Sequence, residues 1–431
     1  MTAKIYMRSL GCPKNSVDSE KTLEAFAARG LLMTSEAELA DIVIINTCGF
    51  INDAKEESIN TIIELAELKK KSRTIKLVVM GCLSERYKED LFKQIPEIDH
   101  IYGVDELNKI ISELTSNIEI NYNSKVPLRI SSSSKGWSYL KISEGCSNTC
   151  SFCIIPKIRG PYKSRNQQSV IAEAKSLSAL GVKELILVAQ DSTIFGADLH
   201  MKDGLAKLLE KLSALEEIDW IRALYMYPAL VTDALISVMA KGSKVLPYFD
   251  IPIQHGSNSI LQSMGRPERR DDIRRLITKI RSACPDATIR TSVMVGFPGE
   301  TNRDFDDLIS LVEELEFDNL GVFEYSPEEG SKAYNLPKRV DKALAKERRA
   351  NVMELQKEIS RKKLSCNVGK IISVIVEGFD EENVVIYGRS KGQVPYIDGV
   401  VILDGVGQPS GSIIDVKVVN STSYDLIAQA L

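Results

Sequence analysis

The sequence has 431 residues, 44% of them apolar, and a formal net charge of −4. This length predicts about two to four globular domains, and the charge gives no indication of nucleic-acid binding. The chain has no run of about eighteen apolar residues that would span a membrane, and its polar start is too short for a signal peptide. We therefore expect a cytoplasmic protein, in which the eight cysteines indicate metal or redox chemistry rather than disulfides.

Residues 1–118 alternate strand-like and helical segments. Strands are predicted at 4–8, 41–45 and 76–80, and helices at about 16–30, 53–71 and 87–94. Such alternation predicts an α/β domain with an open parallel sheet and helices on its faces.

Three cysteines of this domain, Cys12, Cys48 and Cys82, each follow the end of a predicted strand. Ligands of open parallel sheets bind at the carboxyl ends of the strands, so these thiols should converge although they are far apart in sequence. Neighbouring glycines would let the backbone approach a bulky group closely. We expect an iron–sulfur cluster with three protein ligands; the alternative is that all three are ordinary buried core cysteines.

Residues 119–137 lose this pattern and include a serine-rich stretch typical of a flexible linker. A second alternation spans 138–363, with strands predicted at 139–143, 184–188, 221–226, 248–253, 287–295 and 320–325. These six repeats are fewer than those of a closed βα barrel and predict a partial (βα)6 barrel that is open on one side. The helix predicted at 338–363, with ten basic and four acidic residues, is expected to be a solvated connector, and it signals RNA contact only weakly.

Cys146, Cys150 and Cys153 follow the first strand of this second unit. A loop can wrap three thiols at this spacing around a compact inorganic centre, whereas a regular helix or strand cannot. Thiolates are the usual ligands of iron–sulfur clusters, and three ligands leave one iron of a four-iron cubane open. A closed zinc site would need a further ligand, and the three histidines of the chain are not close in sequence.

This Cys-x3-Cys-x2-Cys loop after a strand resembles the signature of the radical S-adenosylmethionine enzymes. In that superfamily the open iron binds the amino and carboxylate groups of S-adenosylmethionine, and an electron from the cluster cleaves it to a 5′-deoxyadenosyl radical. The resemblance implies a catalytic role for Cys146, Cys150 and Cys153. It marks the superfamily and does not identify the substrate.

Other strand ends of the partial barrel carry candidates for holding S-adenosylmethionine. Gln254 follows the fourth strand, and Gly296 and Glu300 belong to a Gly-Phe-Pro-Gly-Glu-Thr segment after the fifth. Sites in βα barrels lie at this end of the strands, so we expect these three residues to bind the cofactor. Each has a structural alternative, as a strand terminator or as part of an ordinary turn into a helix capped by Thr301.

Residues 364–431 contain short predicted strands separated by turns, at 370–376, 383–386, 400–403, 412–419 and 425–428. This pattern predicts a small antiparallel β-barrel. The segment has four basic and eight acidic residues. Because phosphate contacts dominate affinity for nucleic acids, this balance favours a basic protein partner over RNA.

A three-cysteine α/β domain, a radical core and a TRAM-like barrel together resemble the methylthiotransferases over nearly the whole chain. Residues 9–20, the pair Arg159-Gly160 and residues 323–330 are similar to the branch that modifies a ribosomal protein rather than tRNA. The resemblance implies two 4Fe-4S clusters, on Cys12, Cys48 and Cys82 and on Cys146, Cys150 and Cys153. It implies methylthiolation of an aspartate β-carbon in small-subunit ribosomal protein twelve, giving 3-methylthioaspartate, with an electron donor such as flavodoxin or ferredoxin.

Two other hypotheses remain open. The same chemistry on a tRNA adenosine would depend on the basic helix and weaken with salt. A non-catalytic iron–sulfur protein would form no deoxyadenosine. An RNA-binding module with structural zinc would need a basic barrel, and this one is net acidic. Cys284 and Cys366 lie outside both motifs, and we expect them to be structural.

Overall fold

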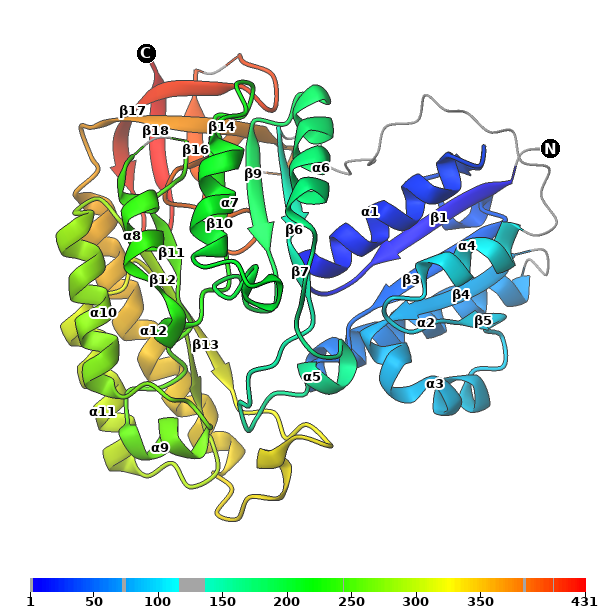
Figure 1. The fold of residues 1–431 in the computed structure, drawn as a ribbon, viewed down its shortest axis with the longest axis horizontal. Helices are drawn as coiled ribbons and strands as arrows, with labels where there is room; N and C mark the ends of the chain where they lie inside the picture. The colour runs from blue at the N-terminus through cyan, green and yellow to red at the C-terminus, as the bar shows by residue number, and fades with distance from the viewer. Residues whose placement is uncertain (1–2, 72–74, 116–135, 243, 383–384, 406) are drawn as a thin grey trace.

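A computed structural model describes residues 3–71, 75–115, 136–242, 244–382, 385–405 and 407–431, so the predicted linker at 119–137 lies almost wholly outside the described residues. Figure 1 shows an N-terminal α/β part, a central arc of strands and helices, and a C-terminal barrel at the opposite end of the arc from α5 and α9. Within the described ranges, no helix is both long and apolar enough to cross a membrane.

The N-terminal part is a parallel sheet in the strand order β2-β1-β3-β4-β5, which confirms the predicted open α/β architecture. The central strand β3 is buried at every position, as expected for a parallel strand covered on both faces. Two-residue strands carry no periodicity, so β2 and β5 were not predicted. The elements are β1 (Lys4–Ser9), β2 (Leu32–Met33), β3 (Ile42–Thr47), β4 (Lys76–Gly81), β5 (His100–Ile101), α1 (Pro13–Ala27), α2 (Asn52–Lys71), α3 (Cys82–Gln94) and α4 (Leu107–Thr115).

Helices α1 and α3 both begin at or next to a candidate cysteine. Pro13 occupies the first turn of α1, where its missing N–H costs nothing and its fixed φ favours the helix. Helix α3 starts at Cys82, five residues earlier than the sequence pattern predicts, and its backbone departs from helical geometry at Tyr87. The prediction therefore found only the part of α3 that follows this kink.

The central part has six parallel strands in two hydrogen-bonded groups, β6-β9-β10 and β11-β12-β13. Backbone hydrogen bonds from Ile221 to Lys244 and from Leu246 to Ile221 join the groups into one arc, as a partial barrel requires. The strands are β6 (Trp137–Lys141), β9 (Glu184–Val188), β10 (Trp220–Ala223), β11 (Tyr248–Asp250), β12 (Thr288–Val295) and β13 (Asn319–Glu324).

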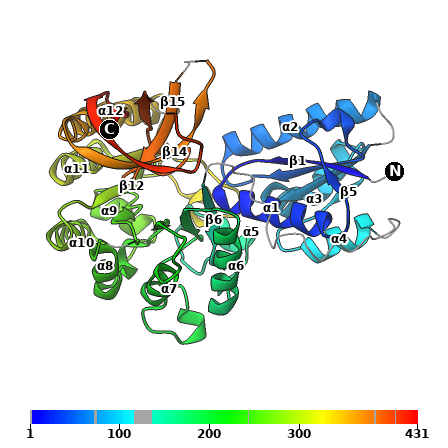
Figure 2. The same cartoon turned by 90° about the horizontal axis from the view of Figure 1, so that it is seen from above.

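Helices follow one another along the outside of this arc (Figure 2). Their apolar faces pack on the outer sides of the strands in one large core cluster. They are α6 (Gln167–Ala179), α7 (Gly204–Ser213), α8 (Asp233–Ala240), α10 (Arg270–Ala283) and α11 (Asn302–Leu315). Short elements fill the strand-end loops: β7 (Ser143–Glu144), α5 (Ile155–Ile158), β8 (Lys163–Ser164) and α9 (Asn258–Ser263).

The basic helix α12 (Lys342–Ser365) belongs to the core and is not only a solvated connector, as its charge pattern predicted. Val352 and Ile359 are buried in the same core cluster as the barrel strands. Several of its cations pair with acidic residues of the core, as Lys362 does with Glu316 and Lys363 with Asp318. These pairs neutralise much of the charge that suggested RNA contact.

The C-terminal part is a closed five-stranded barrel in the order β14-β15-β16-β18-β17. Four strand pairs are antiparallel, as predicted, and the pair β16–β18 is parallel. The strands are β14 (Ile371–Asp380), β15 (Val385–Ser390), β16 (Val401–Asp404), β17 (Ile413–Ser421) and β18 (Leu426–Ala430).

A buried ion network joins this barrel to the central arc. Glu184, the first residue of β9, lies 2.6 Å from Nη2 of Arg389 and 2.9 Å from Nε of Arg222. Burial acts to raise the pKa of Glu184, but the two guanidinium groups outweigh it and hold the pKa below its ordinary value. Gly392 of the barrel also accepts a hydrogen bond from Asn319, the first residue of β13. The barrel is thus fixed to the amino ends of the core strands.

We expect Glu184→Gln to destabilise the metal-free chain by about 3–5 kcal/mol, because it leaves two buried guanidinium groups without their shared carboxylate. Urea unfolding measures the effect. The matched control is Glu210→Gln, whose half-exposed carboxylate pairs with an exposed Lys241 at 3.5 Å; it should change stability by less than about 0.5 kcal/mol. Equal effects of the two substitutions would contradict the account of this network.

Candidate active site

The three N-terminal cysteines lie just past the carboxyl ends of adjacent parallel strands. Cys12 follows β1, Cys48 follows β3 and Cys82 follows β4. The sheet has the flavodoxin-like strand order, in which ligands bind at the point between β1 and β3 where the order of the strands reverses. The structure therefore brings these residues to one sheet edge, as the strand-end argument predicted.

The loops that carry these cysteines pack directly on one another. Gly11 has a φ of +85°, and a Cβ built on it would lie 2.6 Å from the Cβ of Cys48. A Cβ on Gly49 would lie 2.8 Å from the backbone nitrogen of Leu83, the residue after Cys82. Glycine is required at both places because the neighbouring loop occupies the space of a side chain.

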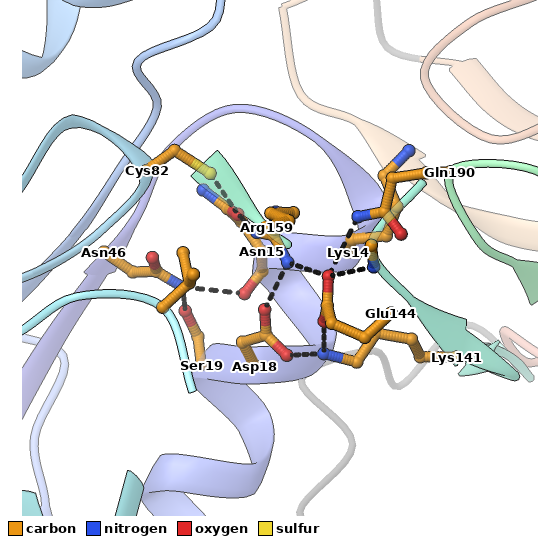
Figure 3. A network of polar contacts seen from close by, with 12 residues as sticks. Lys14, Asn15, Asp18, Ser19, Asn46, Cys82, Lys141, Glu144, Arg159 and Gln190 are labelled. Carbon is orange, nitrogen blue, oxygen red and sulfur yellow. Dashed lines mark hydrogen bonds and ion pairs between the residues drawn. The ribbon is translucent and has the colours of Figure 1, made fainter. Parts of the chain in front are cut away.

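Asn15 ties the three strand ends together (Figure 3). This fully buried residue donates its side-chain amide to the carbonyl of Leu10, at 2.9 Å, and to that of Thr47, at 3.0 Å. Its backbone carbonyl accepts a 2.9 Å hydrogen bond from Asn46. The thiol of Cys82 lies 3.9 Å from the Asn15 side-chain oxygen. The side chain of Asn15 thus contacts the loops before Cys12 and Cys48 and the thiol of Cys82.

The thiols of this set differ in acidity because Lys14 and Arg159 together act on Cys12, whereas burial dominates at Cys82 and Cys48. Burial acts to raise the pKa of Cys12, but Lys14 and Arg159 outweigh it, and the pKa lies below its ordinary value. Burial raises the pKa of Cys82 to about 12, an effect that Arg159 opposes. Burial also raises the pKa of Cys48.

The loop of Cys146, Cys150 and Cys153 has no regular structure, and hydrogen bonds from several segments fix it. The amide of Cys146 donates to the carbonyl of Gly160 at 3.1 Å. The amide of Ser151 donates to Met264 at 2.8 Å, and the Ser151 carbonyl accepts from Ala333 at 2.7 Å. These contacts hold the loop at the carboxyl end of β6. Burial raises the pKa of Cys153 to about 12.

Arg266 is a residue of this site that sequence reasoning missed. Its Nη1 lies 3.7 Å from Sγ of Cys150, and its guanidinium stacks 3.9 Å from the ring centroid of Tyr227. A carboxylate oxygen of Glu268 binds the same guanidinium at 2.5 Å. Arg266 lies beyond α9, more than a hundred residues after Cys150, so no local pattern connects the two.

The three residues predicted to bind S-adenosylmethionine have different surroundings. Gln254 follows β11 with a φ of +69° and bridges to Val293 of β12. Gly296 follows β12 with a φ of +75°, and a Cβ on it would lie 2.7 Å from that of Ala345. Both therefore lie at neighbouring strand ends of the arc. Their part in cofactor binding stays a prediction.

Glu300 is buried and engaged within the protein. Its Oε2 accepts a 3.0 Å hydrogen bond from the amide of Phe297, and its Oε1 lies 3.1 Å from Nη1 of Arg348 in α12. Nε2 of His255 lies 4.0 Å away. These contacts favour a role in holding the Gly296–Glu300 turn, and direct cofactor binding by Glu300 stays untested.

The two cysteine sets adjoin each other across the boundary between the N-terminal and central parts. Cys82 packs in one apolar cluster with Ile154 and Ile158, which directly follow the Cys153 loop. Helix α5 lies between the two parts in Figure 1. On the far side, Glu328 after β13 binds both Lys55 and Arg86 of the N-terminal part, at 3.0 and 2.8 Å. The N-terminal part therefore contacts the loops that follow β6 and β13 at the carboxyl ends of the core strands.

The donor chemistry of both sets fits iron–sulfur ligation. All eight cysteines of the sequence lie in the described ranges, and all are free thiols. Within those ranges no three His, Cys, Asp or Glu side chains are arranged to hold a single metal ion. Cysteines that ligate a four-iron cubane each bind a different iron, so they surround a volume and do not converge on a point. Cys284 ends α10 and Cys366 ends α12, apart from both sets.

Models of three protein families match successive parts of the chain. Residues 4–103 match the uncharacterized protein family UPF0004, residues 140–312 match the radical SAM superfamily, and residues 368–431 match the TRAM domain. These matches follow the same order as the three parts of the fold.

Known proteins are similar over the whole length. The ribosomal protein uS12 methylthiotransferase RimO of Acetivibrio thermocellus is 43% identical over 451 residues, which cover 100% of this chain and 99% of that protein. The protein of the same name from Clostridioides difficile is 44% identical over 440 residues, with 99% of each chain covered. The chain belongs to the RimO family.

Solved structures that are distant in sequence share the fold of this RimO family member. The radical S-adenosylmethionine methyltransferase TsrM from Kitasatospora setae matches with a TM-score of 0.55 and 15% identity, over 78% of this chain and 77% of that one. The cobalamin-dependent radical enzyme OxsB matches with a TM-score of 0.52 and 11% identity, over 83% of this chain and 56% of that one. These likenesses confirm a radical S-adenosylmethionine fold.

In the metal-free chain, Cys12 should react with iodoacetamide at a lower pH than Cys82. The thiolate is the nucleophile, and Lys14 and Arg159 lower the pKa of Cys12 while burial raises that of Cys82 to about 12. Peptide mass spectrometry across a pH series measures both rates, with the exposed Cys366 as an internal standard for the reagent. Labelling of Cys82 at the same pH as Cys12 would contradict this account.

Proposed function

We propose that this protein is a radical S-adenosylmethionine methylthiotransferase that replaces a β-carbon hydrogen of an aspartate in ribosomal protein uS12 with a methylthio group. The observation that carries the proposal is the adjacency of the two cysteine sets, in which Cys82 packs against Ile154 and Ile158. The similarity of the whole chain to RimO proteins supports the same reaction.

The chain supplies two adjacent thiolate sets. Cys146, Cys150 and Cys153 would hold one 4Fe-4S cluster, and Cys12, Cys48 and Cys82 would hold the other. When bound, the core cluster and S-adenosylmethionine would supply the radical, and the N-terminal cluster would supply the sulfur. The contacts of Glu328 with Lys55 and Arg86 hold the N-terminal part against the loop that follows β13, which would keep the two sets close together.

The surface charges favour a protein substrate over tRNA. The barrel buries Glu377 and Arg389 almost completely, and the side chain of Asp398 is only 3% exposed. Its acidic excess is therefore smaller at the surface than in the sequence, but acidic residues still outnumber basic ones among those that remain exposed. Electrostatic affinity for RNA requires several free cations, and those of α12 are largely paired. The basic protein uS12 fits such a surface better.

Reductive cleavage of S-adenosylmethionine needs electrons from outside the chain. We infer a small acidic redox protein, a flavodoxin or a ferredoxin, as the donor. Support comes from the chemistry alone, because a cluster that is oxidised in each turnover must be reduced again.

We expect about eight irons per chain after anaerobic reconstitution, and about four in a triple Cys12/Cys48/Cys82→Ala variant, since each set would hold one four-iron cluster. The matched control is a Cys284/Cys366→Ala variant, which removes thiols outside both sets and should keep about eight. Iron and sulfide analysis measures the outcome. About four irons in both wild type and triple variant would contradict the two-cluster reaction.

The substrate class is tested by incubating the reconstituted enzyme with purified uS12 and, separately, with unmodified tRNA. Product should form on the protein, with deoxyadenosine released in the same reaction. Methylthio product on tRNA alone would favour the tRNA reaction, and absence of deoxyadenosine would indicate a non-catalytic iron–sulfur protein.

A further inference from the structure

Arg159 crosses the boundary between the two cysteine sets. It follows α5 in the central part, and its side chain is only 2% exposed. Its Nη1 binds Glu144 of β7 at 2.9 Å and Asp18 of α1 at 3.2 Å. Its Nη2 donates to the side-chain oxygen of Asn15. One guanidinium thus joins an acidic residue of the radical core to two residues of the N-terminal part (Figure 3).

Hydrogen bonds connect the Arg159 bridge to a cysteine loop on each side of the boundary. On the core side, the residue after Arg159 is Gly160, whose carbonyl accepts the amide of Cys146 at 3.1 Å. On the N-terminal side, Asn15 binds the carbonyls of Leu10 and Thr47, which lie just before Cys12 and Cys48. A continuous path of hydrogen bonds and peptide links therefore runs from one cysteine set to the other.

The charge of Arg159 is also directed at the N-terminal set. The described hydrogen bonds of Arg159 reach Asn15, Asp18 and Glu144, and the Asn15 side-chain oxygen lies 3.9 Å from the thiol of Cys82. Lys14 is the other cation beside Cys12, and it stacks over the Tyr225 ring at 3.6 Å. Glu144 and Asp18 are shared with Lys141, which binds both carboxylates. Within this network the charges of Arg159 and Lys141 balance those of Asp18 and Glu144, and Lys14 adds one further positive charge.

We propose that Arg159 is a positioning residue through which the radical core fixes the N-terminal cysteine loops and sets the charge around the cluster they hold. The inference rests on the proposed two-cluster function and deepens it. Its guanidinium orders the loops through Asn15, whose side chain reaches two strand ends at once. Its positive charge stabilises the reduced form of a neighbouring cluster, because reduction adds an electron to that cluster.

The test measures reduction potentials in full-length chains that keep one cluster each. One background is Cys146/Cys150/Cys153→Ala, which retains the N-terminal set, and the other is Cys12/Cys48/Cys82→Ala, which retains the core set. Arg159→Met should shift the potential of the N-terminal cluster to more negative values and leave the core cluster nearly unchanged. Spectroelectrochemical titration, monitored by electron paramagnetic resonance, gives both potentials.

Arg159→Lys separates charge from geometry. A lysine keeps the positive charge but lacks the fork that reaches Asn15 and the two carboxylates together. In Arg159→Lys, the reduction potential of the N-terminal cluster should therefore lie closer to the wild-type value than it does in Arg159→Met. In the metal-free chain, amide hydrogen exchange in peptides covering 10–15 and 46–49 should accelerate in both Arg159 variants.

Arg281→Met is the matched control. Arg281 lies in α10 and donates to the carbonyl of Glu316 at 2.7 Å, outside the network of Arg159, so its loss should change neither the potential of the N-terminal cluster nor the hydrogen exchange of the cysteine loops. The inference is overturned if Arg159→Met leaves the N-terminal potential unchanged, or shifts both clusters equally. If wild type binds only about four irons and the N-terminal background binds none, the two-cluster function itself fails.

Discussion

The account depends on a constraint of parallel sheets. Neighbouring parallel strands deliver the residues that follow them to the same edge, whatever their separation in sequence. Cys12, Cys48 and Cys82 come together for this reason, and the loops that bear them nest only because Gly11 and Gly49 lack side chains. The central arc obeys the same constraint, so its cysteine loop lies at the carboxyl end of β6. Because the carboxyl ends of the N-terminal strands lie against the loop that follows β6, the two thiolate sets lie beside each other.

Buried charge at the boundary makes this arrangement specific. An apolar contact such as that of Cys82 with Ile154 tolerates sliding, whereas the network of Arg159, Asp18 and Glu144 is satisfied in one relative placement. A misplaced N-terminal part would leave the buried guanidinium of Arg159 without its partners, at a cost of several kcal/mol. The network formed by Glu184, Arg222 and Arg389 has the same effect at the other end of the arc, where it fixes the barrel.

The sequence predicted the strands, the partial barrel and the positions of the cysteines because these depend on local periodicity and on where each strand ends. It did not predict Arg266 beside Cys150 or Asn15 beside Thr47, since these contacts arise only when distant segments pack. The residue composition also gave a wrong estimate of the exposed charge of α12 and of the barrel. Most cations of α12 lie in ion pairs, and Asp398 of the barrel is buried against Arg290 of the core, because a residue count does not distinguish exposed from neutralised groups.

The most direct test of the central claim is the mass of uS12 after reaction with the reconstituted enzyme, S-adenosylmethionine and a reductant. The account predicts that one aspartate-containing peptide gains the mass of a methylthio group in place of a hydrogen, and that fragmentation places the gain on the aspartate. An unmodified uS12, from an enzyme that carries both clusters and forms deoxyadenosine, would contradict the assignment of this substrate.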